Sequence, residues 1–225
     1  MINNRLVNIS LIAIGFLSLI FVIFPNLDIE VSSLFYSEKL GFLYKNQAIV
    51  VLFYKAVPIL TKGFVLLCAL YLLYILVKFR SFKKALSSWA FFLIISAIIA
   101  PGITVNSVLK DNFGRARPRE IIEFGGNKEF SRAFAFSDQC LHNCSFSSGH
   151  AAMGYSFSSI AYVAGSLYFV RIYIASIFFG SMIGLSRIIM GGHFASDVII
   201  SAFLVLLLNH LIYLLWKKKT SELKI

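Results

Sequence analysis

Acidic residues are scarce in this chain, which has 10 Asp and Glu against 21 Lys and Arg among its 225 residues. No stretch gathers the carboxylates that hold Mg²⁺ or Ca²⁺, which argues against a site for these metals. Charge of either sign is limited to 14% of the chain, whereas 59% is hydrophobic and the mean hydropathy is +0.82. A soluble domain is about 45–50% apolar. The composition therefore predicts an integral membrane protein.

Cysteine is also scarce, with three residues in the chain. Cys68 lies inside an apolar run, where a thiol is usually inert packing. Cys140 and Cys144 lie four apart in a polar stretch with His142 between them, which is too few ligands for a closed zinc site. A disulfide and two free thiols both remain open, and a disulfide would require an oxidising compartment.

The first apolar run lacks a small-residue cleavage site, because Phe24-Pro25-Asn26-Leu27 follows it. We therefore expect a retained anchor helix rather than a signal peptide. The chain has no internal repeat and no low-complexity segment. Its length predicts a single domain over residues 1–225.

Six apolar runs have about the length that a helix needs to cross a bilayer. Residues 28–57 are mixed and aromatic, which predicts an interfacial or partly helical connection. The sequence thus predicts an all-α integral membrane protein with six transmembrane helices and a long polar loop, residues 110–149, between the third and the fourth. The expected spans are residues 9–24, 58–77, 86–109, 150–170, 172–190 and 193–216.

Basic residues orient these spans through the positive-inside rule. The positions on the expected cytoplasmic side, together with both termini, are Arg5, the cluster at 78–84, Arg171 and the tail at 217–219. The loop 110–149 and the Gly191-Gly192 turn lie on the opposite side. The net charge of +11 thus fits topology and anionic lipid headgroups, and we expect no nucleic-acid partner.

Three polar clusters fall at the same non-cytoplasmic ends of the predicted spans. The first runs from Lys110 to Pro118. Lys110 and Arg117 in it could both hold a phosphate, the arginine through a two-pronged contact. The alternative interpretation is a basic flank of the third span.

The second cluster is Ser147-Ser148-Gly149-His150, at the start of the fourth span. Free backbone N–H groups and the helix dipole would attract an anion there. The hydroxyl of Ser148 can donate a hydrogen bond, and His150 could act as a proton donor. The alternative is an ordinary capped helix start with an incidental histidine.

The third cluster runs from Ser186 to Asp197, with Arg187 at the end of the fifth span. His193 opens the sixth span, and Asp197 shares its helix face four residues later. A carboxylate there would fix the imidazole tautomer and leave the other nitrogen as a nucleophile. The alternative is a structural ion pair between Arg187 and Asp197.

The three clusters together supply the charge that phosphoryl transfer requires. A phosphate monoester carries about −1.5 to −2 charges near neutral pH. Lys110, Arg117 and Arg187 place three positive charges at one face, where they could stabilise the transferring phosphoryl group. We therefore predict a metal-independent reaction with no cofactor.

The clusters resemble the signature of the type 2 phosphatidic acid phosphatase (PAP2) superfamily, which also includes vanadium haloperoxidases. Its pattern is K-x6-RP, then PSGH, then SR-x5-H-x3-D. The first and third elements match completely, within a motif region at about residues 110–197. In the second element Ser147 replaces the proline, which puts loop rigidity in doubt rather than activity.

This resemblance implies a PAP2-like helical bundle and a phosphoric monoester hydrolase. His193 would attack phosphorus, with Asp197 orienting and charging it. His150 would protonate the leaving oxygen and then activate water, and vanadate should inhibit. The implied phosphate ligands are Lys110, Arg117, Ser148, Gly149 and Arg187.

The segments Gln139–His150 and Phe24–Ile29 resemble bacterial lipid A phosphatases, particularly the 4′-phosphatase branch. The expected substrate is then the 4′-phosphate of lipid A in the periplasmic leaflet of a bacterial inner membrane. Arg115, Arg119 and Arg132 would suit a large anionic headgroup, or would pair with Glu120, Glu123, Glu129 or Asp138.

Several other activities share this chemistry. They are a lipid A 1-phosphatase, an undecaprenyl pyrophosphate phosphatase, a phosphatidylglycerophosphate phosphatase and a lipid phosphotransferase. A non-enzymatic lipid or phosphate transporter is an alternative of another class, but transport sites usually lie near the bilayer midplane rather than at helix ends. The sequence sets no oligomeric state.

Overall fold

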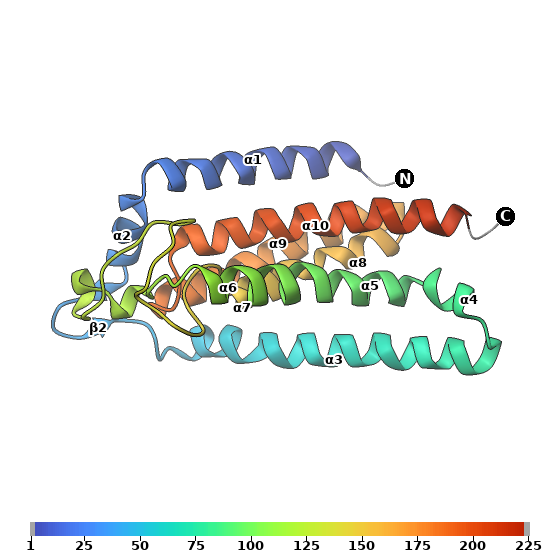
Figure 1. Cartoon of the computed structure of the whole chain (residues 1–225), viewed down its shortest axis with the longest axis horizontal. Coiled ribbons are helices and arrows are strands. Elements are labelled where there is room, and N and C mark those ends of the chain that lie inside the picture. Colours follow the sequence, from blue (N-terminus) through green and yellow to red (C-terminus); the bar gives the residue numbers. More distant parts are fainter. Residues whose placement is uncertain (1–2, 223–225) are drawn as a thin grey trace.

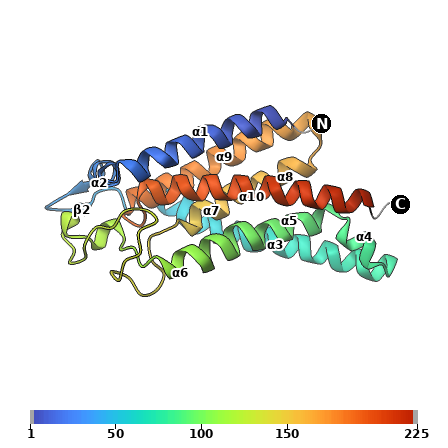
Figure 2. The ribbon, with the colours of Figure 1, turned by 45° about the horizontal axis from the view of Figure 1, so that its top comes forward.

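The computed structural model describes residues 3–222, apart from the side chain at position 111. Its long helices lie side by side in one bundle (Figures 1 and 2), and the irregular segments gather at one end of it. Helix α1 begins and α10 ends at the opposite end. We call the end that carries the irregular segments the loop end.

Five helices in the described part of the chain are long and apolar enough to cross a membrane. They confirm an all-α protein with several membrane-crossing helices. Most bounds lie near the expected ones, but the second helix begins ten residues before the expected 58. The five are α1 (Asn4–Ile23), α3 (Ala48–Phe79), the rod of α5 (Trp89–Ala97) and η1 (Ile98–Leu109), α9 (Ser166–Ile189) and α10 (Ala195–Glu222).

The expected fourth span, residues 150–170, is not one helix. The chain forms α7 (Gly149–Ser156) and α8 (Ser158–Val163), and each is too short to span a bilayer alone. The five long helices therefore do not confirm the expected fourth of the six transmembrane helices. The chain then turns at Gly165, whose φ of +86° suits glycine, before α9 begins.

Burial explains why α7 and α8 are short and interrupted. Most side chains from 151 to 162 are buried by other helices rather than exposed. The break between the two helices is paired internally, because Asn209 of α10 donates to the Ser156 carbonyl at 3.3 Å and to Ser158 Oγ at 2.9 Å. A segment covered by protein tolerates such a break, which a lipid-facing helix does not.

The connection between α1 and α3 is partly helical, as expected. It contains α2 (Asn26–Ser33) and a two-stranded antiparallel hairpin in which Tyr36 pairs with Phe42. The hairpin and the smaller elements of the polar loop lie at the loop end. Their bounds are β1 (Tyr36–Ser37), β2 (Gly41–Phe42), η2 (Pro118–Glu120) and η3 (Ile122–Phe124), and α4 (Phe82–Leu86) joins α3 to α5.

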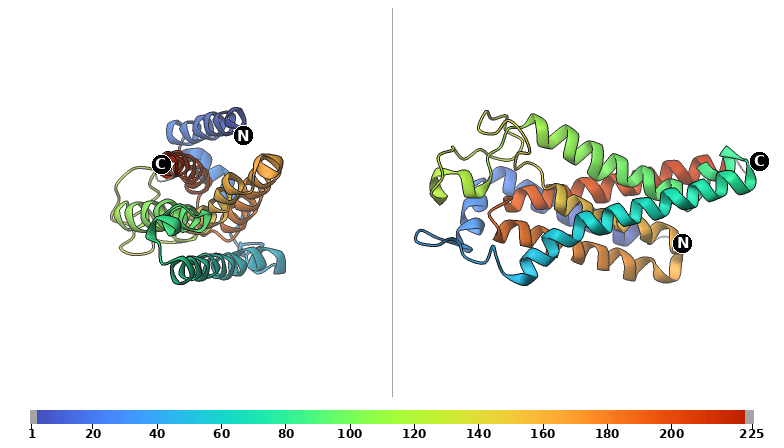
Figure 3. Two further views of the ribbon diagram at one scale, coloured as in Figure 1. Left: turned by 90° about the vertical axis from the view of Figure 1, so that its right-hand side faces the viewer. Right: turned by 90° about the horizontal axis from the view of Figure 1, so that it is seen from below.

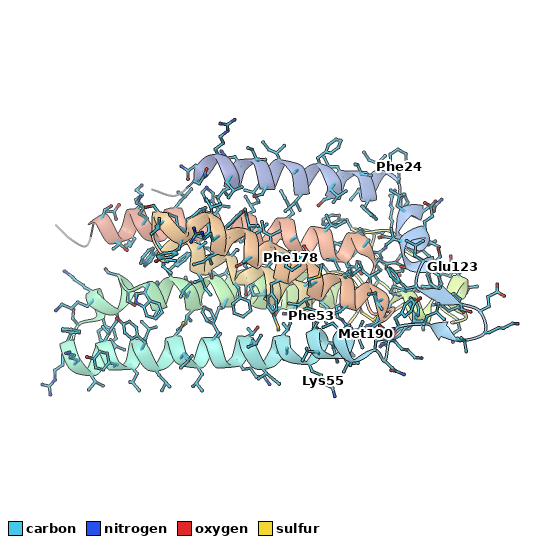
Figure 4. All side chains as sticks on the ribbon, turned by 180° about the vertical axis from the view of Figure 1, so that it is seen from behind. Phe24, Phe53, Lys55, Glu123, Phe178 and Met190 are labelled. Atoms are coloured by element: carbon cyan, nitrogen blue, oxygen red, sulfur yellow. A yellow bond between two sulfur atoms is a disulfide. The ribbon has the colours of Figure 1, made fainter. Side chains whose placement is uncertain are left out.

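The bundle has central and peripheral helices. Figure 3 shows α1 and α3 on opposite outer sides. In its most apolar window α3 is 11% buried, whereas α10 is 50% buried. Exposed apolar side chains such as Ile12, Ile59 and Leu67 lie on the outside of the bundle. Figure 4 shows side chains pointing outward along the whole length of the bundle. The outer apolar surface suits lipid.

The rod α5–η1 delivers the first cluster to the loop end. Its second half is a π-helix that contains Pro101, a residue without a backbone N–H. Asn106 Nδ2 donates to the Pro101 carbonyl at 2.7 Å. The rod continues into α6 (Lys110–Asn112), so Lys110 begins where the apolar rod ends.

A small aromatic core fixes the outer elements to the start of α10. Tyr36, Phe42 and Phe124 contact one another edge to face at 5.0–5.6 Å between ring centroids. Phe194 belongs to the same buried cluster. Gly191 has a φ of +58° and lies against the Phe42 ring, where a Cβ would clash. This packing holds the turn that precedes His193.

Candidate active site

All three polar clusters converge at the loop end. His150 is the second residue of α7, Arg187 lies in the last turn of α9, and His193 precedes α10. The positive charges of Lys110, Arg117 and Arg187 all act on the His150 imidazole. The structure therefore brings these five residues together from three separate segments of the chain.

His193 is held in one tautomer by a backbone carbonyl. Its side chain is 1% exposed, and Nδ1 lies 2.7 Å from the carbonyl oxygen of Ser145. Because a carbonyl only accepts hydrogen bonds, Nδ1 carries the proton and Nε2 keeps its lone pair. Asp197 Oδ2 lies 3.7 Å from Nδ1. The carboxylate thus adds charge, while Ser145 fixes the ring, which differs from the expected role of Asp197.

Burial lowers the pKa of His193 to about 4, although the nearby Asp197 carboxylate opposes the shift. His193 lies between α9 and α10, outside the membrane-crossing helices. With this pKa the ring is neutral at physiological pH. A neutral imidazole with a free Nε2 is the form that can act as a nucleophile.

Asp197 is saturated by hydrogen bonds from other groups. Its Oδ1 accepts from Arg115 Nη1 at 2.6 Å, and its Oδ2 accepts from Ser145 Oγ at 2.5 Å and from the Phe194 N–H at 2.9 Å. The alternative of a structural pair between Arg187 and Asp197 is therefore wrong. Arg115 is the arginine that pairs with this carboxylate.

Arg115 has neither of the two roles expected for it. Its guanidinium is fully buried between Asp28 and Asp197, at 2.8 Å and 2.6 Å. It does not reach toward a headgroup, and none of the four acids proposed as partners pairs with it. Nε donates to the Ser131 carbonyl, so all of its nitrogens are engaged. Arg119, in contrast, is half-exposed and lies 3.9 Å from Glu120.

Arg187 is buried without a carboxylate partner among the described residues. It is 4% exposed, and its Nη1 contacts Met190 Sδ at 3.3 Å. Within residues 3–222, no group accepts a hydrogen bond from its Nε. Gly192 leaves no room for a side chain against this guanidinium. A buried cation with an unused donor is costly, so an anion is the partner that the site requires.

Arg117 is the second buried guanidinium of the site. It is 9% exposed, and its Nη2 donates to the Asn143 carbonyl at 2.6 Å. Burial and the nearby charge of Arg119 lower the pKa of Arg117, but arginine stays protonated at physiological pH. In the described part of the chain no ion pair neutralises Arg117. Two buried arginines thus face the site with uncompensated charge.

His150 stacks on Tyr54, a residue that the sequence analysis did not single out. The two rings lie 4.8 Å apart at 25°, and Arg187 Cζ lies 4.5 Å from the centroid of the same Tyr54 ring. The aromatic ring is thus shared by the imidazole and the guanidinium. No motif marks Tyr54, because it lies 96 positions before His150 on the outer helix α3.

His150 lies at the start of α7, outside the five membrane-crossing helices. Burial and the positive charge of Arg187, with smaller effects of His193, Lys110 and Arg117, lower the pKa of His150 to about 3. A negatively charged ligand would oppose these cations and favour the protonated ring. The protonation of His150 is thereby coupled to the occupancy of the site.

Ser148 and Gly149 form the start of α7. Ser148 Oγ accepts from the Ala151 N–H at 3.5 Å, and the Ser148 N–H donates to the Asp197 carbonyl at 3.2 Å. The backbone N–H of Ser148 is therefore engaged rather than free, contrary to expectation. Gly149 lies so close to the Asn106 side chain that a Cβ would clash, which brings η1 against the site.

Cys140 and Cys144, for which two states were open, form a disulfide with a Cα–Cα distance of 5.6 Å. It closes the turn that contains Asn143, whose carbonyl holds Arg117. Asp28 is another residue that the sequence motifs do not identify. It precedes Arg115 by 87 positions, and only its place in the Phe24–Ile29 segment drew attention to it.

The site combines a neutral imidazole with a free Nε2, a second histidine and uncompensated buried cations. Such a combination suits the transfer of a phosphoryl group to histidine. The PAP2 superfamily pattern matches residues 89–221. The chain belongs to the PAP2 superfamily, and it is a phosphatase of that family, as the resemblance predicted.

Curated relatives extend the likeness beyond the motifs. The chain is 34% identical over 224 residues to the lipid A 4′-phosphatase of Francisella tularensis subsp. novicida (strain U112), covering 94% of this chain and 96% of that protein. It is 38% identical over 105 residues to the lipid A 4′-phosphatase of Rhizobium leguminosarum, covering 46% and 44% of the two chains. No solved structure matches the chain.

Replacing Arg187 by Gln should weaken binding of inorganic phosphate by about 10- to 100-fold, because a hydrogen bond to a charged group contributes about 1.5–3 kcal/mol. Isothermal titration calorimetry of the purified protein in detergent measures this. Arg132→Gln is the matched control, since Arg132 is an exposed cation of the same polar loop. Equal phosphate affinity in wild type and Arg187→Gln would remove Arg187 from the anion site.

Proposed function

We propose that this protein removes the 4′-phosphate of lipid A at the periplasmic face of a bacterial inner membrane, through a phosphohistidine at His193. The observation that carries the chemistry is the hydrogen bond from His193 Nδ1 to the Ser145 carbonyl, which leaves Nε2 as the nucleophile. The substrate rests on the relatives, since the match to a lipid A 4′-phosphatase covers nearly the full length of both chains.

In the first step, Nε2 of His193 attacks phosphorus and the bond to the lipid oxygen breaks. The leaving oxygen takes a proton from His150. Binding of a phosphate dianion among three cations supplies the negative charge that protonation of His150 requires. The imidazole of His193 gains positive charge as the N–P bond forms, and Asp197 at 3.7 Å stabilises it.

In the second step, water attacks the phosphohistidine. His150, now neutral, takes a proton from this water, and the N–P bond breaks with its electron pair returning to Nε2. Inorganic phosphate leaves, and both histidines are restored. Lys110, Arg117 and Arg187 would hold the phosphoryl oxygens throughout, with Ser148 and Gly149 at the start of α7 beside them.

The reaction that we propose uses no metal ion. Three side-chain cations provide the charge stabilisation that Mg²⁺ supplies in many phosphoryl transfers. The two buried carboxylates of the described residues, Asp197 and Asp28, each accept hydrogen bonds from protein donors. Neither is arranged to present its oxygens to a divalent ion.

The proposed orientation puts the loop end in the periplasm and both chain termini in the cytoplasm. The basic cluster at 78–84 and the tail at 217–219 lie at the other end of the bundle, as the positive-inside rule requires of the cytoplasmic side. The α7–α8 segment then returns the chain through the interior of the bundle. A disulfide in the loop between η1 and α7 fits the oxidising periplasm.

The test of this function is the purified protein, assayed on lipid A, phosphatidylglycerophosphate and undecaprenyl pyrophosphate. Mass spectrometry should show loss of the 4′-phosphate from lipid A, in the presence of EDTA as well. His193→Ala should reduce this loss to background while the protein stays folded in detergent. Removal of the 1-phosphate, or activity confined to the other lipids, would contradict the proposed substrate without affecting the assigned chemistry.

His150→Ala should trap the phosphorylated enzyme when an aryl phosphate is the substrate. The aryl leaving group departs without a proton, so the first step survives, whereas the second step lacks its base. We expect acid-labile phosphate on His193, detected by mass spectrometry at neutral pH, and absent from the double variant His150→Ala/His193→Ala. Rapid turnover without accumulation would show that His150 is not the base.

The activity should persist at acidic pH. A histidine with an ordinary pKa is about 90% protonated at pH 5.5, but His193, with its pKa lowered to about 4, remains mostly neutral there. The acid limb of kcat/KM, corrected for protonation of the substrate phosphate, should therefore fall well below pH 6. An acid limb near pH 6.5 in the corrected profile would mean that His193 is not shielded in the free enzyme.

A further inference from the structure

Asp28 lies outside the three clusters but is joined to them by buried hydrogen bonds. It belongs to the short helix α2 and its side chain is fully buried. Its Oδ2 accepts from Arg115 Nη2 at 2.8 Å and from Ser196 Oγ at 2.5 Å, and its Oδ1 accepts from the Ser196 N–H at 2.8 Å. The connection spans 168 positions of sequence.

Asp28, Arg115 and Asp197 form a row of charged groups that leads to His193, with Asp28 at its far end. One guanidinium faces two carboxylates, Asp28 through Nη2 and Asp197 through Nη1. Asp197 in turn lies 3.7 Å from His193 Nδ1. With both acids ionised, the three groups carry a net charge of −1. All of them are buried, so their charges are screened far less than at a surface.

The charge at the end of this row changes during the reaction. When Nε2 bonds to phosphorus, Nδ1 keeps its proton and the ring becomes an imidazolium. The net negative charge of Asp28, Arg115 and Asp197 balances it. If Asp28 were neutral, Arg115 would cancel Asp197 and the imidazolium would be left without compensation in a buried site.

We propose that Asp28 is a positioning residue for the phosphatase reaction. Asp28 neutralises part of the charge of Arg115, so that the negative charge of Asp197 can stabilise the imidazolium formed at His193. This inference rests on the proposed phosphohistidine. Asp28 touches no substrate and acts only through Arg115 and Asp197. Its effect therefore belongs to the chemical step and not to phosphate binding.

The charge of Asp28 is the variable to isolate. Burial and the nearby negative charge of Asp197 raise the pKa of Asp28, while the Arg115 guanidinium and the hydrogen bond from the Ser196 hydroxyl oppose the rise. Asn has nearly the same shape as Asp but no charge. Glu30→Gln is the matched control, because Glu30 is an exposed acid two positions later on the same helix. It removes one negative charge from α2 without altering the row.

Asp28→Asn should lower kcat by about 10- to 100-fold and leave KM within about two-fold. The size is that seen when a hydrogen-bond partner behind a metal-ligating side chain is lost, which is the analogous arrangement. Vanadate bonded to His193 should bind more weakly by a similar factor, whereas inorganic phosphate should bind as before. Glu30→Gln should match the wild type in all four quantities. An unchanged kcat, or parallel losses for vanadate and phosphate, would overturn the proposal.

A second variant separates charge from shape where Asp28→Asn does not fold. Asp28→Ala, purified in formate, should recover kcat with formate but not with formamide, which has the same shape and no charge. Equal recovery with formate and formamide would show that Asp28 has a structural role only. The same conclusion would follow if neither Asp28→Asn nor Asp28→Ala folded and formate had no effect. Because vanadate and phosphate binding need no lipid, this outcome is distinct from failure of the lipid A assignment.

Discussion

The distribution of buried charge at the loop end is the constraint on which the rest of the structure depends. Two buried carboxylates, Asp28 and Asp197, are both taken by Arg115. Arg117 and Arg187 are buried as well, but no ion pair in the described part of the chain neutralises them. Burying a cation without compensation is costly. In the mechanism that we propose, the phosphate of the substrate provides the negative charge that compensates Arg117 and Arg187.

Much of the fold could be predicted from the sequence, because long apolar runs are a local property. The last residues of α1 and α9 and the first residue of α10 lie within two residues of the expected ones, whereas the other three bounds differ by five or six. The α7–α8 segment could not be predicted in this way. Whether an apolar run faces lipid or protein is decided by its neighbours, and here other helices cover it, with Asn209 pairing the break. The hydropathy of residues 150–170 does not indicate whether this segment is covered by other helices.

The same distinction applies to the site. Residues at short spacing, such as His193 and Asp197, are visible in the sequence because four positions keep them close together, even though His193 itself precedes α10. Partners from distant segments are not. Arg115 was expected near a headgroup or beside local acids, but its partners come from α2 and α10. Tyr54 carries no signal at all, because an aromatic residue on an outer membrane helix is ordinary.

Coupling between charge and protonation gives the site its order of events. Burial and the surrounding cations lower the pKa of His150 to about 3, so the ring is neutral at physiological pH. A phosphate dianion offsets those cations, so the proton that the leaving oxygen needs is favoured only once the substrate is bound. The shared Tyr54 ring keeps His150 and Arg187 in fixed relation, at 4.8 Å and 4.5 Å. In the proposed mechanism, Arg187 binds the phosphate and His150 donates the proton, so both groups respond to the same ligand.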